Sequence, residues 1–95
     1  MAKIFLLACV DNAPTDEETA KVRASLAHSF GEKFLEMGNR SFLVAAEAPI
    51  LTKDISDKAG ISDGDAGSYI VTPLDSYYGW ANQSYWEWID TFDKS

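Results

Sequence analysis

The sequence predicts an α+β domain whose elements follow the order βαββαβ, with an extra helix at the C-terminal end. Three observations predict this order: a continuous apolar run at residues 3–10, a capped amphipathic helix after it, and turn residues between two β-prone runs in mid-chain. Ninety-five residues are enough for one hydrophobic core. We expect a single domain over residues 1–95, with a core of about residues 3–75 and an extension of about residues 76–95.

The first strand and the first helix have clear local signals. Residues 3–10, KIFLLACV, form an apolar run that is typical of a central strand buried on both faces. A helix is expected after Thr15, because Thr15 and Glu18 have the spacing of a capping box. Gly31 is suited to end this helix as a left-handed C-cap. The residues expected to face inward are Thr19, Val22, Leu26 and Phe30.

Residues 32–48 allow two interpretations. In the first, KFLEM and RSFLVAAEA are the strands of a β-hairpin, because the turn-forming pair Gly38-Asn39 lies between two β-prone runs. In the second, the first helix continues to Met37. The second interpretation would place Gly31 inside the helix at a cost of about 1 kcal/mol. We therefore prefer the hairpin.

The next segment predicts a short helix and a last strand. Thr52 is expected to N-cap the helix, whose inner side would carry Leu51, Ile55 and Ala59. Gly60 is expected to end this helix in a Schellman motif, with the following Ile61 folded back onto the last turn. SYIVTPL then reads as a strand. Its proline lacks an amide donor, which indicates an edge position or the end of the strand.

A final helix is expected at residues 82–92. Helical spacing puts Glu87 and Asp90 on its outer side and Trp86 off the main apolar arc. The residues expected on that arc are Tyr85, Trp88, Ile89 and Phe92. The first and third strands are the most apolar and suit central positions, whereas the second and fourth suit the edges. We therefore predict a ferredoxin-like βαββαβ sandwich with an extra C-terminal helix.

The chain is strongly acidic, with a formal net charge of −7. A phosphate backbone attracts basic residues, so this charge argues against direct binding of nucleic acid. After Lys58 the only basic residue is Lys94, and the same segment holds six acidic residues: Asp63, Asp65, Asp75, Glu87, Asp90 and Asp93. This acidic third of the chain has two interpretations, a solubilising surface or a surface for a basic partner.

Cysteine content and hydropathy indicate a cytoplasmic location. The chain has one cysteine, Cys9, inside an apolar run, so neither a disulfide framework nor a thiolate metal site can form within one chain. The apolar run that follows Lys3 is too short for a signal sequence or a membrane span. We expect a protein of a reducing compartment that does not cross a membrane.

Asp11 is the residue most suggestive of chemistry. It follows the first strand, where a carboxylate can reach a divalent metal or activate water. The alternative is that Asp11-Asn12-Ala13-Pro14 is only a turn, and we prefer it.

The order of elements and the segment KIFLLACVD resemble the small CRISPR-associated nucleases that scaffold spacer acquisition, the SinR-like proteins and the GhoS-type antitoxin ribonucleases. The resemblance implies a ferredoxin-like dimer in which Asp11 pairs with its counterpart across the two-fold axis to hold a metal. The chain lacks the basic residues that usually follow that aspartate.

Aromatic residues gather beyond the last strand. They are Tyr77, Tyr78, Trp80, Trp86 and Trp88. Tyrosine and tryptophan supply large contact areas at low entropic cost and are enriched at interface hot spots. We therefore name these five residues as a candidate partner-binding site, with the alternative that they cap the core.

These observations favour a small interaction or regulatory module over an enzyme. It would act without a cofactor, form a homodimer and bind a protein through its acidic, aromatic C-terminal face. One alternative is a metal-dependent nuclease with Asp11 binding Mg²⁺ or Mn²⁺ at a dimer axis. A second is an inhibitor that mimics nucleic acid and occupies a basic groove of its partner.

Overall fold

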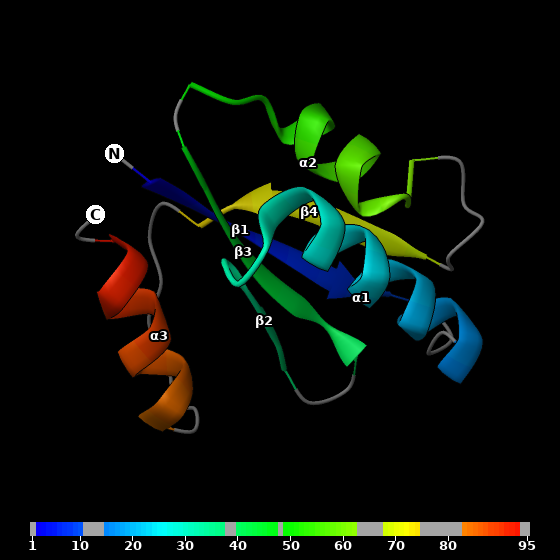
Figure 1. The fold of residues 1–95 in the computed structure, drawn as a ribbon, viewed down its shortest axis with the longest axis horizontal. Helices are drawn as coiled ribbons and strands as arrows, with labels where there is room; N and C mark the ends of the chain where they lie inside the picture. Colours follow the sequence, from blue (N-terminus) through cyan, green and yellow to red (C-terminus); the bar gives the residue numbers. More distant parts are fainter. Residues whose placement is uncertain are drawn as a thin grey trace.

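The chain folds around one four-stranded sheet with helices on both of its faces. A computed structural model describes residues 2–10, 15–37, 40–47, 49–62, 68–74 and 83–93. Its elements in chain order are β1 (Ala2–Cys9), α1 (Asp16–Phe30), β2 (Phe34–Glu36), β3 (Phe42–Glu47), α2 (Thr52–Ala59), β4 (Tyr69–Pro73) and α3 (Gln83–Asp93), as Figure 1 shows. The α+β class predicted from the sequence is confirmed.

The sheet is antiparallel throughout and has the strand order β2-β3-β1-β4. The register places Leu6 of β1 opposite Leu43 of β3 on one side and Thr72 of β4 on the other. β1 and β3 are therefore the central strands, and β2 and β4 are the edges, as the apolar character of the strands predicts. Pro73 ends β4 on such an edge, where a missing amide donor is tolerated.

Helices α1 and α2 cover one face of the sheet and form the first core with it (Figure 1). Its buried residues are Phe5, Leu7, Val22, Leu26, Phe42, Val44, Ala46, Ile55, Ala59 and Ile61. Burying a large apolar side chain fully contributes about 1.5–3 kcal/mol. This core is therefore the main source of stability of the domain.

The capping box of α1 forms as the sequence predicts. The Thr15 amide donates to the Glu18 carboxylate at 2.8 Å, and the Glu18 amide donates to Thr15 Oγ1 at 3.1 Å. At the other end Gly31 is the C-cap and has a positive φ of 62°, as expected, but its ψ of −120° lies outside the left-handed helical region that the sequence predicts. The reason is an immediate reversal of the chain into β2, in which the Lys33 amide donates to the Phe30 carbonyl at 3.1 Å.

The hairpin interpretation of residues 32–48 is confirmed, because α1 ends at Phe30 and β2 pairs with β3. Phe34 lies opposite Val44 in the register. The Met37 amide donates to the Ser41 carbonyl at 2.8 Å and extends the pairing beyond β2. The pair Gly38-Asn39 lies outside the described residues.

The start of α2 differs from the expectation. Thr52 is the first residue of the helix, and Leu51 holds the N-cap position. The Asp54 carboxylate accepts from the Leu51 amide at 3.2 Å, so an acidic side chain reaches back to the cap. The expected inward position of Leu51 is also wrong, because this residue is 70% exposed. Since Ile55 and Ala59 turn into the core, Leu51 is left on the outside.

The end of α2 has the Schellman geometry that the sequence predicts. Gly60 adopts the left-handed conformation, with φ 77° and ψ 26°. The Ile61 amide donates to the Ser56 carbonyl at 3.2 Å, and the Gly60 amide donates to the Asp57 carbonyl at 3.2 Å. Ile61 is buried in the first core, so this motif ties the helix end to the sheet.

Helix α3 lies on the opposite face of the sheet and covers a second, smaller core (Figure 1). The buried residues of this second core are Ile4, Leu43, Ala45 and Ile89. Trp88, Ile89 and Phe92 face it, as their helical spacing predicts. Trp86 also packs against it, so its expected position off the apolar side is wrong. No helix in the described ranges has the length and apolar character that crossing a membrane requires.

Candidate functional site

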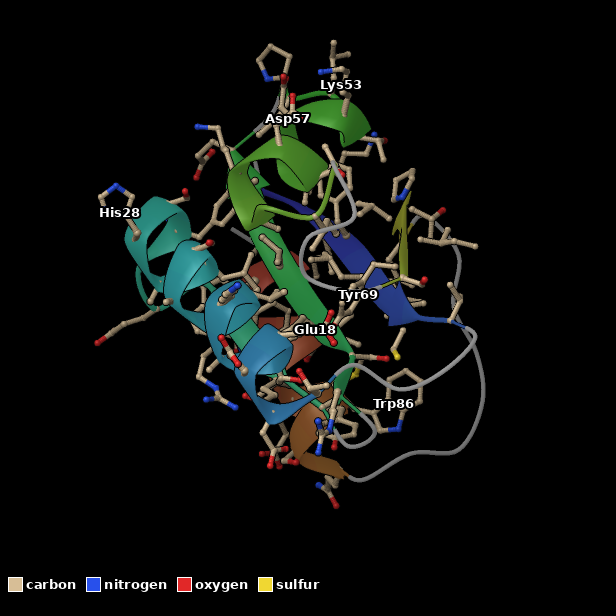
Figure 2. The ribbon with its side chains drawn as sticks, turned by 90° about the vertical axis from the view of Figure 1, so that its right-hand side faces the viewer. Glu18, His28, Lys53, Asp57, Tyr69 and Trp86 are labelled. Carbon is tan, nitrogen blue, oxygen red and sulfur yellow. The ribbon has the colours of Figure 1, made fainter. Side chains whose placement is uncertain are left out.

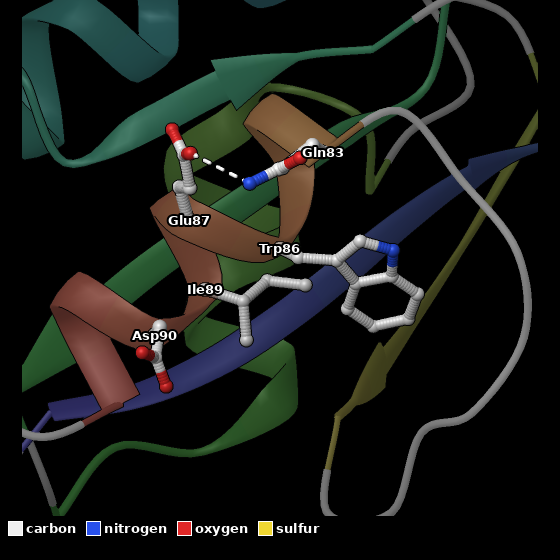
Figure 3. Close-up of a pocket in the computed structure, with 5 residues that line it drawn as sticks. All are labelled: Gln83, Trp86, Glu87, Ile89 and Asp90. Carbon is white, nitrogen blue, oxygen red and sulfur yellow. Dashed lines mark hydrogen bonds between the residues drawn. The ribbon is translucent and has the colours of Figure 1, made fainter.

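The described residues of α3 line a pocket at the surface of the molecule. It has a volume of about 270 Å³ and is open to solvent. Its lining residues are Gln83, Trp86, Glu87, Ile89 and Asp90, drawn in Figure 3. Residues three, four and seven positions apart share one side of a helix, which explains why these residues meet. We call them the α3 pocket.

The two tryptophans of α3 have different surroundings. The Trp88 ring lies against the Phe92 ring, with centroids 4.7 Å apart and an angle of 44° between the planes. Both rings pack on the second core, so Trp88 contributes to the fold. Trp86 packs on the same core and also lines the α3 pocket. Figure 3 shows the Trp86 and Ile89 side chains extending from the same side of α3, with the Glu87 carboxylate directed away from them.

The polar lining of the α3 pocket is acidic. Gln83 Nε2 donates to Glu87 Oε1 at 3.3 Å across one helical turn (Figure 3). The sequence of α3, QSYWEWIDTFD, contains three acidic residues and no basic one. The carboxylates of Glu87 and Asp90 line the same pocket as the Trp86 ring and attract a cation through direct charge. The pocket therefore suits a positively charged group, such as an arginine or lysine side chain.

Four of the six residues predicted as sites cannot be compared with the structure. Asp11, the candidate metal and catalytic residue, lies outside the described residues, as do Tyr77, Tyr78 and Trp80 of the candidate partner-binding site. Their roles stay predictions. Trp86 and Trp88 are the two candidates that the structure describes, and it places both on α3.

A second group of polar residues lies around the end of β1 on the side of α1. Tyr69 Oη donates to the Arg40 carbonyl at 2.9 Å, and burial raises the pKa of Tyr69 to about 12. Figure 2 shows Tyr69 and Glu18 in this part of the molecule and His28 at the far end of α1, pointing into solvent. Sequence reasoning missed this group, because Tyr69 and Arg40 are 29 positions apart.

Two ion pairs near this group join α1 to the β2–β3 hairpin. Arg23 binds the Glu36 carboxylate with two hydrogen bonds of 2.6 and 3.1 Å, and Arg40 binds Asp16. The hydrogen bond from Arg23 holds the pKa of Glu36 below its usual value. Exposed ion pairs of this kind are worth about 0–1 kcal/mol. They therefore link the hairpin to the helix but add little to the stability of the domain.

Cys9 is less buried than its apolar surroundings in the sequence suggest. It is the last residue of β1 and is partly exposed, because the strand ends there. Its amide donates to Ser41 Oγ at 3.2 Å. Across the described parts of the chain, the structure brings together no group of three or more histidine, cysteine, aspartate or glutamate side chains that could hold a metal.

Comparisons of this chain with protein-family models, curated proteins and solved structures found no match. The function must therefore be inferred from the geometry of the surface itself.

Proposed function

We propose that the domain is a ferredoxin-like sandwich. The order β1-α1-β2-β3-α2-β4 supports this assignment, as do the central positions of β1 and β3 in an antiparallel sheet. Helices α1 and α2 on one face agree with it as well. In this assignment α3 is an addition that covers part of the other face.

We further propose that the protein is a non-enzymatic interaction module. It acts in the cytoplasm without a cofactor, as a homodimer, and binds a basic segment of a protein partner in the α3 pocket. The observation that carries this proposal is that two exposed acidic residues, Glu87 and Asp90, line a pocket together with Trp86, on a helix without a basic residue. Tryptophan is among the residues most enriched at binding hot spots.

The position of the acidic residues in α3 supports binding over a purely structural role. Asp90 lies in the last turn of the helix, at the negative end of its dipole. An acidic side chain there lowers helix stability by roughly 0.3–1 kcal/mol. A basic partner segment would remove this cost, because its positive charge interacts with both the carboxylates and the helix end.

The proposal is tested with a pair of variants that change the net charge equally. One carries Glu87→Gln and Asp90→Asn in the α3 pocket, and the other carries Glu17→Gln and Glu32→Gln, which are exposed residues on and after α1. Tagged full-length proteins are used to capture partners, which are identified by mass spectrometry. We expect the wild type and the α1 control to capture the same basic protein, and the α3 variant to lose it by roughly tenfold or more.

The captured complex is expected to weaken steeply as salt is added, because exposed charges are screened. Trp86→Ala, checked for folding by circular dichroism, should weaken it as well. Equal capture by the α3 variant and the α1 control would overturn the proposal, since the loss would then not depend on the pocket.

A further inference from the structure

β4 has an outer edge that no described strand pairs with. On its inner edge the Val10 amide donates to the Ser68 carbonyl at 3.0 Å, and the Leu74 amide donates to the Ile4 carbonyl at 2.8 Å. Hydrogen bonding alternates along an antiparallel pair, so Ile70 and Thr72 also bond toward β1. Tyr69 and Val71 therefore direct their amide and carbonyl groups outward. Pro73 offers only a carbonyl there.

The two edges of the sheet differ in charge. β2 is three residues long and ends in Glu36, which is paired with Arg23. Charged residues on a short edge strand discourage pairing with other chains. By contrast, residues 68–74, SYIVTPL, carry no charge. In a chain with a net charge of −7, an uncharged edge is where two copies meet with the least repulsion.

Ile70 makes this edge unusual, because it is a large apolar residue that is 57% exposed. The register places Ile70 opposite Ala8 and Thr72 opposite Leu6, so their side chains lie on the sheet face that α3 covers farther along. Ser68 and Thr72 on either side of it are also exposed. A second chain could therefore approach this strand without displacing any described side chain from the core.

We propose that two copies of the chain pair antiparallel through β4, with the two-fold axis between the two Ile70 residues. This inference rests on the homodimer of the proposed function and names its interface. Tyr69 of each copy exchanges both backbone hydrogen bonds with Val71 of the other. The two Ile70 side chains then face each other in a non-hydrogen-bonded pair, where Cα atoms are about 4.5 Å apart.

The outward backbone groups of β4 limit the possible registers. Only odd-numbered residues of β4 direct their backbone groups outward, so odd positions must oppose odd positions. An axis at Val71 would place Pro73 opposite Tyr69, where the proline cannot donate to the Tyr69 carbonyl. It would also place Ile70 opposite Thr72. With the axis at Ile70, Pro73 takes no part in the hydrogen bonds between Tyr69 and Val71. The exposed Ile70 side chain of each copy is then covered by Ile70 of the other copy.

This arrangement forms one continuous sheet from both copies. Because the axis is perpendicular to the sheet, the two α3 pockets lie on the same face. Two pockets on one face can hold a partner that carries two basic segments, which raises the overall affinity without new contacts. The proposed dimer would therefore bind its partner bivalently, through one α3 pocket of each copy.

The test measures the mass of the full-length protein in solution over a range of concentrations by analytical ultracentrifugation. We expect a dimer that strengthens with added salt, since screening reduces the repulsion between two acidic chains. Ile70→Lys should raise the dimer Kd roughly tenfold or more, because it places like charges opposite each other. The control is Leu51→Lys, at the other large exposed apolar residue, and it should leave the dimer unchanged.

The register is tested by disulfide formation in a Cys9→Ser background. Ile70→Cys should cross-link with itself under mild oxidation, because the Cα separation at the axis suits a disulfide. Thr72→Cys should not, since its counterpart lies several residues away along the strand. Cross-linking between Ile70→Cys and Thr72→Cys chains, without Ile70→Cys homodimers, would overturn the register.

A wild type that stays monomeric, or an Ile70→Lys variant that dimerises as the wild type does, would overturn the interface. Glu87→Gln with Asp90→Asn separates the two proposals. It should abolish partner capture and leave the dimer intact. Failure of the dimer therefore cannot be mistaken for failure of the α3 pocket.

Discussion

Helices α1 and α3 cover opposite faces of the same sheet, but their charges are arranged in opposite ways. α1 has acidic residues throughout its first turn and His28 in its last turn. α3 has no acid in its first turn, no base in its last turn, and acidic residues near its C-terminal end. The acidic first turn of α1 favours the helix dipole, whereas the acidic residues near the end of α3 oppose it. α1 is therefore stabilised by its own sequence, whereas α3 depends on packing.

The buried sides of the two helices differ as well. Val22 and Leu26 of α1 are fully buried in the first core. α3 has one buried residue, Ile89, among its described side chains, and Trp86 and Trp88 are partly exposed. The apolar side chains of α1 are thus shielded from solvent, whereas α3 leaves part of its tryptophan side chains exposed, where a partner can contact them.

The prediction with the largest expected change in unfolding free energy compares the first core with the second core. Leu26→Ala should lower the free energy of unfolding by about 2–5 kcal/mol, because a cavity remains in a fully enclosed site. Ile89→Ala should cost about 2 kcal/mol, the low end of the range, because a site near the surface can collapse around the missing atoms. Urea denaturation measures both. Lys21→Ala, an exposed change on α1, is the control and should stay within about 0.5 kcal/mol.

Equal losses for Leu26→Ala and Ile89→Ala would contradict the view that the α3 side is the looser one. Hydrogen exchange gives an independent measurement. Amides of α3 should exchange faster than those of α1 in the wild type, and Ile89→Ala should speed exchange in α3 without affecting α1.

The second prediction concerns local stabilisation of α1. Thr15→Ala removes the side-chain acceptor of the capping box and should lower the free energy of unfolding by about 1 kcal/mol. Thr52→Ala is the matched control, since Thr52 stands inside α2 and does not cap it. It should stay within about 0.5 kcal/mol. A loss at Thr52 as large as that at Thr15 would show that Thr52 does act as a cap.

The third prediction uses the pH dependence of the α1 side. Tyr69→Phe removes the hydrogen bond to the Arg40 carbonyl and should cost about 0.5–1.5 kcal/mol at neutral pH. Burial raises the pKa of Tyr69 from 10.0 to about 12. The unfolded chain therefore releases this proton first, and the contribution of Tyr69 is full below about pH 10 and falls as the pH rises toward 12.

The measurement is the difference in unfolding free energy between wild type and Tyr69→Phe across that pH range. Other groups titrate in both proteins, so their contributions to the unfolding free energy largely cancel in this difference. A difference that stays constant up to pH 12 would show that the tyrosine is not held in its neutral form.

These contrasts also explain which parts of the molecule could be predicted from the sequence. The start of α1 was predictable because Thr15 and Glu18 interact within one turn. The sequence predicts the N-cap of α2 at Thr52, one residue later than its observed position at Leu51. Two local arrangements are possible here: Thr52 can cap the helix with its hydroxyl, or the Asp54 carboxylate can accept from the Leu51 amide. The packing of Ile55 and Ala59 on the sheet selects between them.

The candidate site was only partly predictable, for a related reason. Helical spacing gives the angles between α3 residues, but it does not say which direction faces the sheet. Helical spacing alone therefore predicts Trp86 off the apolar side, whereas in the structure it packs on the second core. The hydrogen bond between Tyr69 and Arg40 depends on the arrangement of strands, which no local pattern contains.

The prediction with the smallest expected change in unfolding free energy concerns the opposite charge arrangements of α1 and α3. Asp90→Asn removes an acid near the negative end of α3 and should raise the free energy of unfolding by roughly 0.3–1 kcal/mol. Glu17→Gln removes an acid from the first turn of α1 and should lower it by a similar amount. Urea denaturation at low ionic strength measures both changes, and added salt should shrink both.

A loss of stability in Asp90→Asn would contradict this comparison, because Asp90 would then hold the fold. The expected gain would have a functional meaning. The same substitution should make the protein more stable and, together with Glu87→Gln, poorer at binding its partner. A residue that lowers stability while it supports binding is expected at a functional surface and not in a purely structural helix.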